Sequence, residues 1–558
     1  MYKTIFLIFL SLCSQSLLKA QIAKGLELKV DQVFKVYDNS ETPGISIGFI
    51  KDGQLQFSKS YGMANLEHQI PVSDTTVFSL ASVSKQFTAL AILLLEEQGK
   101  LSLDDDIRKY LPEFKDYGSK ITIKMLANHT SGIRGHLSLI GQAGIVPDNV
   151  ITTTMVHDMI YRQQELNFTP GSKFSYSNSG YVLMAEIVEK VSGQTFAEFM
   201  EKEIFQPLGM HDSFVMDDFH RIIKNRARSY QLWSEGYVNA PANYSYYGST
   251  NLYTTLQDLS KWSLNFGQIK VGSKAIFEKM NTLGILNNGE TFGYALGQFR
   301  TDFNGLTQIS HSGGDAGYRA FLGRFPEQQA AVLLLSNNST VYAERKALEV
   351  ADLFLKANYP VKTKDITPEL ATNAFIKIKP EELKQWAGSY LNSENYLVRN
   401  ISLRNDSLIY TRPEQGNRET VLLALSSSIF QMGADPNMVL KFKEGSLNAI
   451  QVLKNGKILE SYQAYKSVDY NTVALQQFTG EFYSEELETE YKLQIEGEKL
   501  VVQHPKMWDV ELSALTMDVF LANTWRFRSL VFERNAKEEV IGFRIFSDRA
   551  ENVKFVKK

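Results

Sequence analysis

The sequence has almost no cysteine, since Cys13 is the only one in 558 residues. A disulfide needs two thiols, so a disulfide framework is excluded, and so is a metal site built from several cysteines. The eight histidines show no metal-ligand spacing such as H-x-H or H-E-x-x-H. The sequence therefore predicts neither a metal nor another cofactor.

Basic runs are also lacking, and the formal net charge is -3 at pH 7. Proteins that bind nucleic acid usually carry a basic patch, so nucleic acid is not an expected partner. After residue 20 no run reaches the ~18 apolar residues that span a bilayer. We expect no transmembrane segment in the mature protein.

The N-terminal stretch has the pattern of an export signal. Lys3 precedes an apolar run from Ile5 to Leu12, and Ala20 offers a small residue for cleavage. This pattern predicts a signal peptide over residues 1–20, which contains Cys13. We therefore expect a secreted protein, periplasmic in a bacterial host.

The region up to residue 358 reads as one mixed domain. Apolar residues alternate on either side of an Asp52-Gly53 turn, which predicts a β-hairpin over 43–61. Residues 101–292 are largely helical and loop-rich, and strand patterns return from 294–299 to 330–336. We predict an α/β (α+β) domain in which an antiparallel sheet is flanked by helices and interrupted by a helical insertion.

The C-terminal part contains an internal repeat. Both copies carry a leucine, an aromatic residue, a glycine and a second aromatic residue at the same spacing. They are Leu383, Trp386, Gly388 and Tyr390 in the first copy and Leu475, Phe478, Gly480 and Phe482, 92 residues later, in the second.

Both copies alternate polar and apolar residues between turn signals, which predicts two all-β, barrel-like modules. The predicted organisation is a signal peptide at 1–20, the mixed domain at 21–358, a linker at 359–380 and β modules at 381–467 and 468–558.

Ser82-Val83-Ser84-Lys85 opens the apolar run of a predicted helix. If this helix begins at Ser82, then Ser82 and Lys85 share a face of its first turn, and the helix N-terminus adds positive potential beside the hydroxyl. A buried lysine can accept a serine proton because desolvation disfavours its charged form. Ser82 is the candidate nucleophile and Lys85 its base.

A second pattern is Tyr176-Ser177-Asn178. A phenol beside an ammonium group ionises more easily, so Tyr176 can relay protons and share the base role with Lys85. Asn178 can donate and accept at once, and so can hold both the lysine and a substrate carbonyl.

The third pattern is His311-Ser312-Gly313-Gly314, expected where a strand ends. Glycine allows a close approach of substrate backbone, and the amides of Ser82 and Gly314 form a candidate oxyanion hole. His311 contributes a hydrogen bond, and a positive charge only when protonated, because its ordinary pKa is about 6.5. His311, Ser312, Gly313 and Asn178 are the candidate substrate-binding residues.

In this order, Ser82-x-x-Lys85, Tyr176-x-Asn178 and His311-Ser312-Gly313 resemble the motifs of the serine β-lactamase and penicillin-binding-protein superfamily. The branch with class C β-lactamases, D,D-carboxypeptidases, D-aminopeptidases and related esterases is the nearest. The stretch 126–133 also resembles this branch, and its His129 is expected to shape a loop near the site. The resemblance covers roughly residues 30–355 and implies a β-lactamase-like fold.

The resemblance implies a serine hydrolase that acts through an acyl-enzyme on Ser82. His311 stands where class C β-lactamases carry lysine, so the motif is closer to D,D-peptidases and D-aminopeptidases. We expect cleavage of amide or ester bonds in small peptides that contain D-amino acids. An esterase or a weak β-lactamase is one alternative, and a non-catalytic penicillin-fold protein that binds cell-wall fragments is another.

Two roles are considered for the β modules. The leading expectation is that they narrow the catalytic cleft, as in the D-aminopeptidase-like layout. The competing one is that they offer aromatic residues such as Trp386, Trp508 and Trp525 to carbohydrate or cell wall. Core packing of these tryptophans is the favoured expectation. The sequence does not determine the exact substrate or the oligomeric state.

Overall fold

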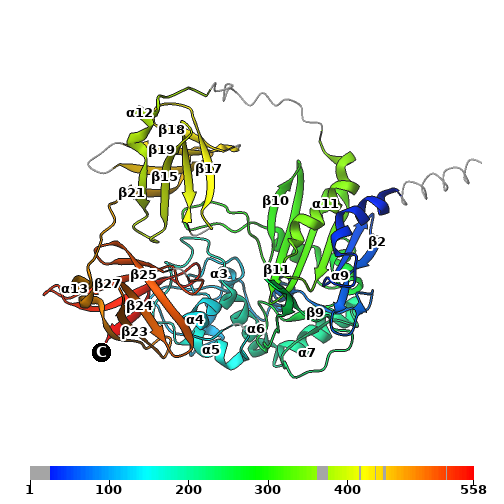
Figure 1. Ribbon diagram of the computed structural model, residues 1–558. Coiled ribbons are helices and arrows are strands. Elements are labelled where there is room, and N and C mark those ends of the chain that lie inside the picture. Colours follow the sequence, from blue (N-terminus) through cyan, green and yellow to red (C-terminus); the bar gives the residue numbers. More distant parts are fainter. Residues whose placement is uncertain are drawn as a thin grey trace, which may run out of the picture. The chain divides into compact units, whose positions relative to one another are not determined.

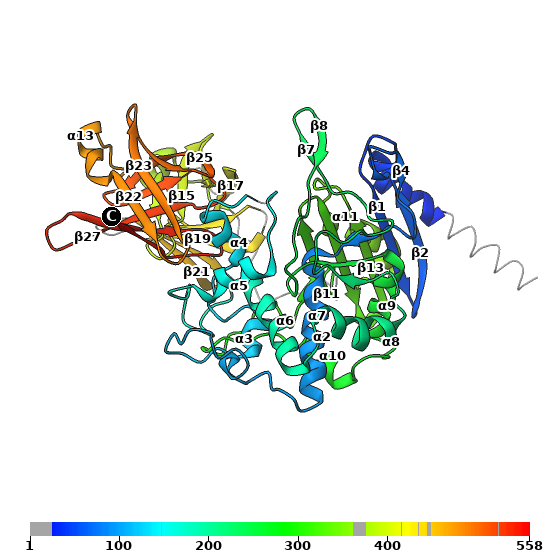
Figure 2. The ribbon, with the colours of Figure 1, turned by 90° about the horizontal axis from the view of Figure 1, so that it is seen from below.

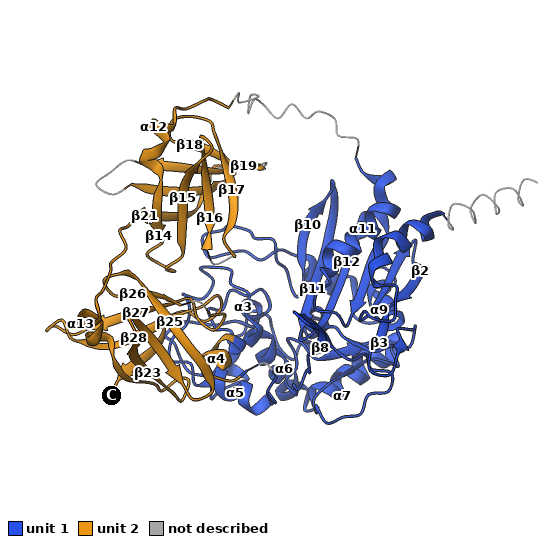
Figure 3. Ribbon diagram, viewed as in Figure 1, with its two compact units in different colours: residues 1–137, 146–361 blue, residues 138–145, 362–558 orange. Residues whose placement is uncertain are grey.

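The computed structural model describes residues 25–146, 148–360, 375–413, 416–433, 435–443, 448–522 and 524–558. The chain divides into two compact units, residues 1–137 with 146–361 and residues 138–145 with 362–558 (Figure 3). The predicted signal peptide and residues 361–374 of the predicted linker lie outside the described residues. Within the described ranges, no helix combines the length and hydropathy needed to cross a membrane.

Unit 1 is built on a six-stranded antiparallel sheet with the order β10-β11-β12-β13-β1-β2 (Figure 1). The strands are β1 (Ile45–Lys51), β2 (Gln54–Tyr61), β10 (Phe299–Phe303), β11 (Leu306–Asp315), β12 (Tyr318–Phe325) and β13 (Ala330–Ser336). Ile45 of β1 lies opposite Ser336 of β13, so segments far apart in sequence complete one sheet. The predicted mixed fold with a helical insertion is confirmed.

The prediction of a strand at 294–299 is wrong in its position. Gly297 has a φ of 76°, in the left-handed region, so the chain turns there and β10 begins only at Phe299.

Helices surround the sheet and form the insertion. They are α2 (Ser84–Glu97), α3 (Ile123–Ala127), α4 (His136–Gln142), α5 (Thr153–Tyr161), α6 (Asn178–Ser192), α7 (Phe196–Met200), α8 (Gln206–Leu208), α9 (Leu256–Asn265), α10 (Lys274–Asn281) and α11 (Ala343–Leu355). Two strand pairs and one three-stranded sheet add β3 (Met63–Asn65), β4 (Ile70–Pro71), β5 (Phe78–Ser79), β6 (Phe214–Val215), β7 (Tyr230–Trp233), β8 (Gly236–Asn239) and β9 (Leu252–Thr254). Figure 2 shows the β7–β8 hairpin projecting from unit 1.

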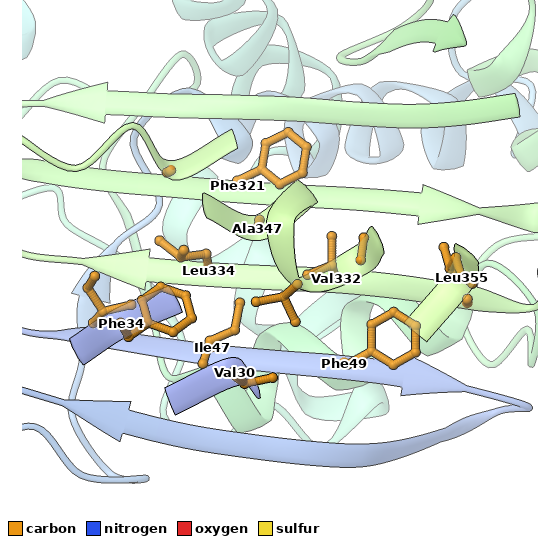
Figure 4. Packing of buried hydrophobic residues seen from close by; sticks show 14 of the residues in the cluster. Val30, Phe34, Ile47, Phe49, Phe321, Val332, Leu334, Ala347 and Leu355 are labelled. Carbon is orange, nitrogen blue, oxygen red and sulfur yellow. The ribbon is translucent and has the colours of Figure 1, made fainter. Parts of the chain in front are cut away.

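One face of the sheet packs against the helical residues 25–34 and against α11. Side chains two residues apart on a strand share a face, so Ile45, Ile47 and Phe49 of β1 all enter this apolar cluster (Figure 4). The opposite face is covered by α9, which contacts β1 and β13. Burial on both faces holds the middle strands in a fixed register, which gives the nearby site a rigid support.

Unit 2 contains two closed eight-stranded barrels, which confirms the predicted all-β modules. The first comprises β14 (Gly388–Leu391), β15 (Val398–Arg404), β16 (Ser407–Arg412), β17 (Arg418–Ala424), β18 (Ile429–Met432), β19 (Asp435–Lys443), β20 (Ala449–Lys454) and β21 (Lys457–Ala464). The second comprises β22 (Gly480–Ser484), β23 (Thr489–Glu496), β24 (Lys499–His504), β25 (Met507–Thr516), β26 (Val519–Ala522), β27 (Ser529–Arg534), β28 (Val540–Phe546) and β29 (Val553–Lys557).

The repeated residues hold the same place in both barrels. Short helices α12 (Pro380–Leu383) and α13 (Thr472–Leu475) each lead into a 3-10 turn that ends at the first aromatic residue of the repeat. Trp386 and Phe478 are buried in their barrels. For the other two tryptophans the expected core packing is wrong, because Trp508 is 91% exposed and Trp525 is 61% exposed.

Candidate active site

Ser82 lies in a tight turn before α2 rather than at the first position of that helix. The 3-10 turn η2 (Ala81–Val83) runs directly into α2, which begins at Ser84. Ala81 has a φ of 46°, an unfavourable conformation for a residue with a Cβ. Such strained backbone is typical of functional turns, and here it presents a partly exposed Ser82 beside a buried helix.

Lys85 is the hydrogen-bond partner of this serine. Its side chain is fully buried, and Nζ donates to Ser82 Oγ at 3.1 Å and to the Ser249 carbonyl oxygen at 2.7 Å. The expected proximity of Ser82 and Lys85 is therefore present although the helix starts two residues later. Sequence reasoning missed Ser249, because a backbone carbonyl gives no side-chain signal.

Aromatic rings surround the ammonium group of Lys85. Nζ lies 5.0 Å from the ring centroid of Tyr176 and 5.6 Å from that of Tyr181. The His129 ring lies 4.2 Å from the Tyr176 ring, and its Nδ1 accepts from the Ser177 backbone N–H at 3.2 Å. The structure thus brings Tyr176 to Lys85, and His129 holds the loop that carries it.

Asn178 is the first residue of α6, which packs against α2. Its Oδ1 is buried and accepts no hydrogen bond from any described residue. Buried polar atoms are nearly always paired, so an open acceptor at the start of α6 is a group that a ligand could use.

The glycine motif lies within β11, not at the end of a strand as expected. β10 pairs with residues 306–310 of β11, whereas β12 pairs with residues 309–315. No described strand continues beyond β10 along the other edge of residues 311–315. A Cβ built on Gly313 falls 2.3 Å from the Leu80 carbonyl oxygen and 3.2 Å from Ser82 N, so β11 lies directly against the Ser82 turn.

His311 is neutral in this arrangement. Nε2 accepts from the Tyr294 hydroxyl at 3.2 Å, and Nδ1 donates to the Ser312 carbonyl oxygen at 2.6 Å. Desolvation, with a smaller contribution from the Lys85 charge, lowers the pKa of His311 to about 3. Both ring nitrogens are engaged within the protein, so His311 carries no positive charge for a substrate near neutral pH. The Ser312 carbonyl fixes this tautomer because it can only accept, and Tyr294, the partner of Nε2, was not identified from the sequence.

The neighbouring polar groups of β11 also have partners. Ser312 Oγ donates to Glu344 at 3.0 Å, and Thr250 Oγ1 donates to Asp315 Oδ2 at 2.6 Å. Desolvation raises the pKa of Asp315 and outweighs the opposing effects of Thr250 and Lys85. A cavity of about 900 Å³ lies along Ser312, Gly313 and α11. Among the described residues, no three His, Cys, Asp or Glu side chains are grouped to hold a metal ion.

Acid should destabilise unit 1 through His136 and His311. Burial lowers the pKa of each to about 3, from the ordinary 6.5, so the unfolded chain binds protons that the folded chain rejects. Their contribution is complete above pH 6.5 and falls as the pH drops toward 3. We expect a loss of roughly 3 kcal/mol for the pair between pH 6.5 and pH 5.

The measurement is urea unfolding at fixed pH, followed by far-UV circular dichroism, which reports on the helices of unit 1. A chain with both His136→Gln and His311→Gln should show a flatter pH dependence over this range. Equal slopes for the parent and the double variant would contradict the expectation.

Comparison with known proteins gives three findings. A family sequence model described as Beta-lactamase matches residues 30–354. Penicillin-binding protein 4* of Bacillus subtilis is 33% identical over 373 residues, which cover 64% of this chain and 81% of that protein. A D-aminopeptidase of Brucella anthropi is 22% identical over 526 residues, which cover 90% of this chain and 93% of that protein.

A solved structure is also similar to most of the chain. The octameric penicillin-binding protein homologue from Pyrococcus abyssi has a TM-score of 0.54 and 26% identity. The match covers 79% of this chain and 99% of the other.

Proposed function

Because the chain belongs to the β-lactamase family, we propose that it is an exported serine hydrolase that forms an acyl-enzyme on Ser82. The observation that carries this proposal is the pairing of Ser82 Oγ with the fully buried Lys85 Nζ at 3.1 Å. A serine attacks a carbonyl only when a base removes its proton, and full burial favours the uncharged amine that can do so.

The proposed reaction has two steps. The Lys85 amine, assisted by Tyr176, takes the Ser82 proton while Oγ bonds to the carbonyl carbon of an amide or ester. The carbonyl oxygen accepts hydrogen bonds from the amides of Ser82 and Gly314, and Tyr176 returns the proton to the leaving group. Water then adds to the acyl carbon, and its proton returns to Ser82 Oγ as the acid departs.

Small peptides that contain D-amino acids are the proposed substrates, with cleavage of the D-aminopeptidase or D,D-peptidase type. One support is the D-aminopeptidase relative, whose match covers 90% of this chain. Another is the neutral His311, because a permanent cation at this position would favour the carboxylate of a β-lactam. Asn178 Oδ1, which accepts from no described residue, is suited to receive a substrate N–H.

The mass of the intact protein after exposure to a serine-reactive phosphonate tests the nucleophile. We expect one adduct on the parent and none on Ser82→Ala. Ser84→Ala is the matched control, because Ser84 lies on the same segment but accepts from Leu252 N at 3.3 Å. It should keep the adduct. Failure of the folded parent to react, or an unchanged adduct on Ser82→Ala, would rule out Ser82 as the activated group.

A panel of D-alanyl and L-alanyl amides, short esters and penicillins then tests the substrate class. We expect kcat/KM to be highest for the D-alanyl amides, at least about tenfold above the L forms. If kcat/KM were higher for esters or penicillins, Ser82 would remain the nucleophile, but D-amino-acid peptides would not be the preferred substrates.

A further inference from the structure

A second cavity in unit 1, with a volume of about 360 Å³, lies where Arg324 of β12 meets the end of α9. Its lining includes Arg324, Phe266, Asn281 and Ser263 together with apolar residues such as Ile50 and Leu264. None of the residues that line it belongs to the Ser82 site. Its volume is within the range of small-ligand pockets, about 300–1,000 Å³.

Arg324 is a buried cation that has no counter-ion among the described residues. Arg324 is only 5% exposed. Its guanidinium carbon lies 3.4 Å from the Phe266 ring centroid, and Nη2 donates to Gln298 Oε1 at 2.7 Å. Nε has no hydrogen-bond partner, and no carboxylate of the described chain forms an ion pair with this arginine. Desolvation lowers the pKa of Arg324 to about 9, and no nearby negative charge among the described residues offsets this effect. An isolated buried charge is costly, so an anion beside it would be favoured.

Two further donors line the same cavity. Asn281 Oδ1 accepts from Gln298 Nε2 at 2.8 Å, which leaves the Asn281 NH2 group to donate. The Ser263 hydroxyl has no recorded partner among the described residues and also lines the cavity. No aspartate or glutamate contributes to the described lining. The last turn of α9 lies nearby, but the partial negative charge of a helix end is only about half a unit.

We propose that this cavity binds a small organic carboxylate. The guanidinium N–H groups that are not bonded to Gln298 can donate to a carboxylate, and Asn281 and Ser263 supply additional donors. The apolar lining from Ile50 and Leu264 suits a short hydrocarbon or aromatic body. The proposal does not depend on hydrolysis at Ser82.

Thermal unfolding of the full chain with increasing sodium benzoate tests this proposal. We expect a saturable rise in Tm of at least about 2 °C in the parent at constant ionic strength. The rise should be lost in Arg324→Gln and kept in Arg300→Gln, which removes an exposed arginine from β10. Sodium chloride and inorganic phosphate are the comparison anions.

Asn281→Ala provides a second variant that retains Arg324, and it should raise the benzoate concentration at half-saturation by about tenfold. Crystals soaked in 4-iodobenzoate should place an anomalous iodine signal in this cavity. The proposal is overturned if benzoate gives no saturable rise, if the rise survives in folded Arg324→Gln, or if phosphate gives a larger one. An iodine signal confined to other sites also overturns it.

Discussion

Replacing Lys85 with methionine should lower kcat/KM by at least about 10³ while leaving the protein folded. Lys85 Nζ is the recorded hydrogen-bond partner of Ser82 Oγ, so its removal leaves the hydroxyl without a base within reach. Methionine keeps most of the buried volume and has no ionisable group, so it is suited to this fully buried position. Steady-state kinetics together with Tm separates this chemical loss from unfolding.

Lys100→Met is the matched control, since Lys100 is exposed just beyond the end of α2. This variant should keep its activity within a factor of about two. If Lys85→Met retained more than a tenth of the parent activity, Lys85 would not be the base.

Gly313→Ala is the second change with a large expected effect. The added methyl group would lie 2.3 Å from the Leu80 carbonyl oxygen and 3.1 Å from Ala81 Cβ, so β11 and the Ser82 turn must move apart. A displacement of about 1 Å in a catalytic group can cost about 10²-fold in rate. We therefore expect kcat/KM to fall about 10²-fold, with a loss of about 1–3 kcal/mol in stability from overpacking.

Gly314→Ala is the comparison for this prediction. A Cβ on Gly314 meets nothing nearer than Arg319 Nη1 at 3.6 Å, and the backbone amide proposed for the oxyanion hole is retained. Its kcat/KM should fall far less than that of Gly313→Ala. Similar losses in the two variants would show that the contact between Gly313 and the Ser82 turn does not control activity.

Short-range patterns in the sequence predicted much of the architecture. Alternating apolar residues on either side of Asp52-Gly53 predicted the hairpin of β1 and β2, because every second residue of a strand faces the same side of the sheet. The repeat at Trp386 and Phe478 predicted two similar barrels, because each copy carries its own turn signals and apolar alternation. Such signals depend only on neighbouring residues, so they can be recognised without knowledge of the tertiary packing. The exposed Trp508 is a position that these signals did not predict, because residue type alone does not determine whether a side chain faces the core or the solvent.

For the candidate site, the sequence by itself determined which chemical groups are available: Ser82, Lys85, Tyr176 and the glycine motif after His311. Only the tertiary structure decided their environment. Lys85 donates to the carbonyl of Ser249, 164 residues away. Burial, with a smaller contribution from Lys85, lowers the pKa of His311 and keeps it neutral. The lone charge of Arg324 likewise becomes apparent only when the lining of its cavity is known. The reason is that hydrogen-bond partners and desolvation depend on which distant segments meet, and the spacing of residues along a chain does not contain that information.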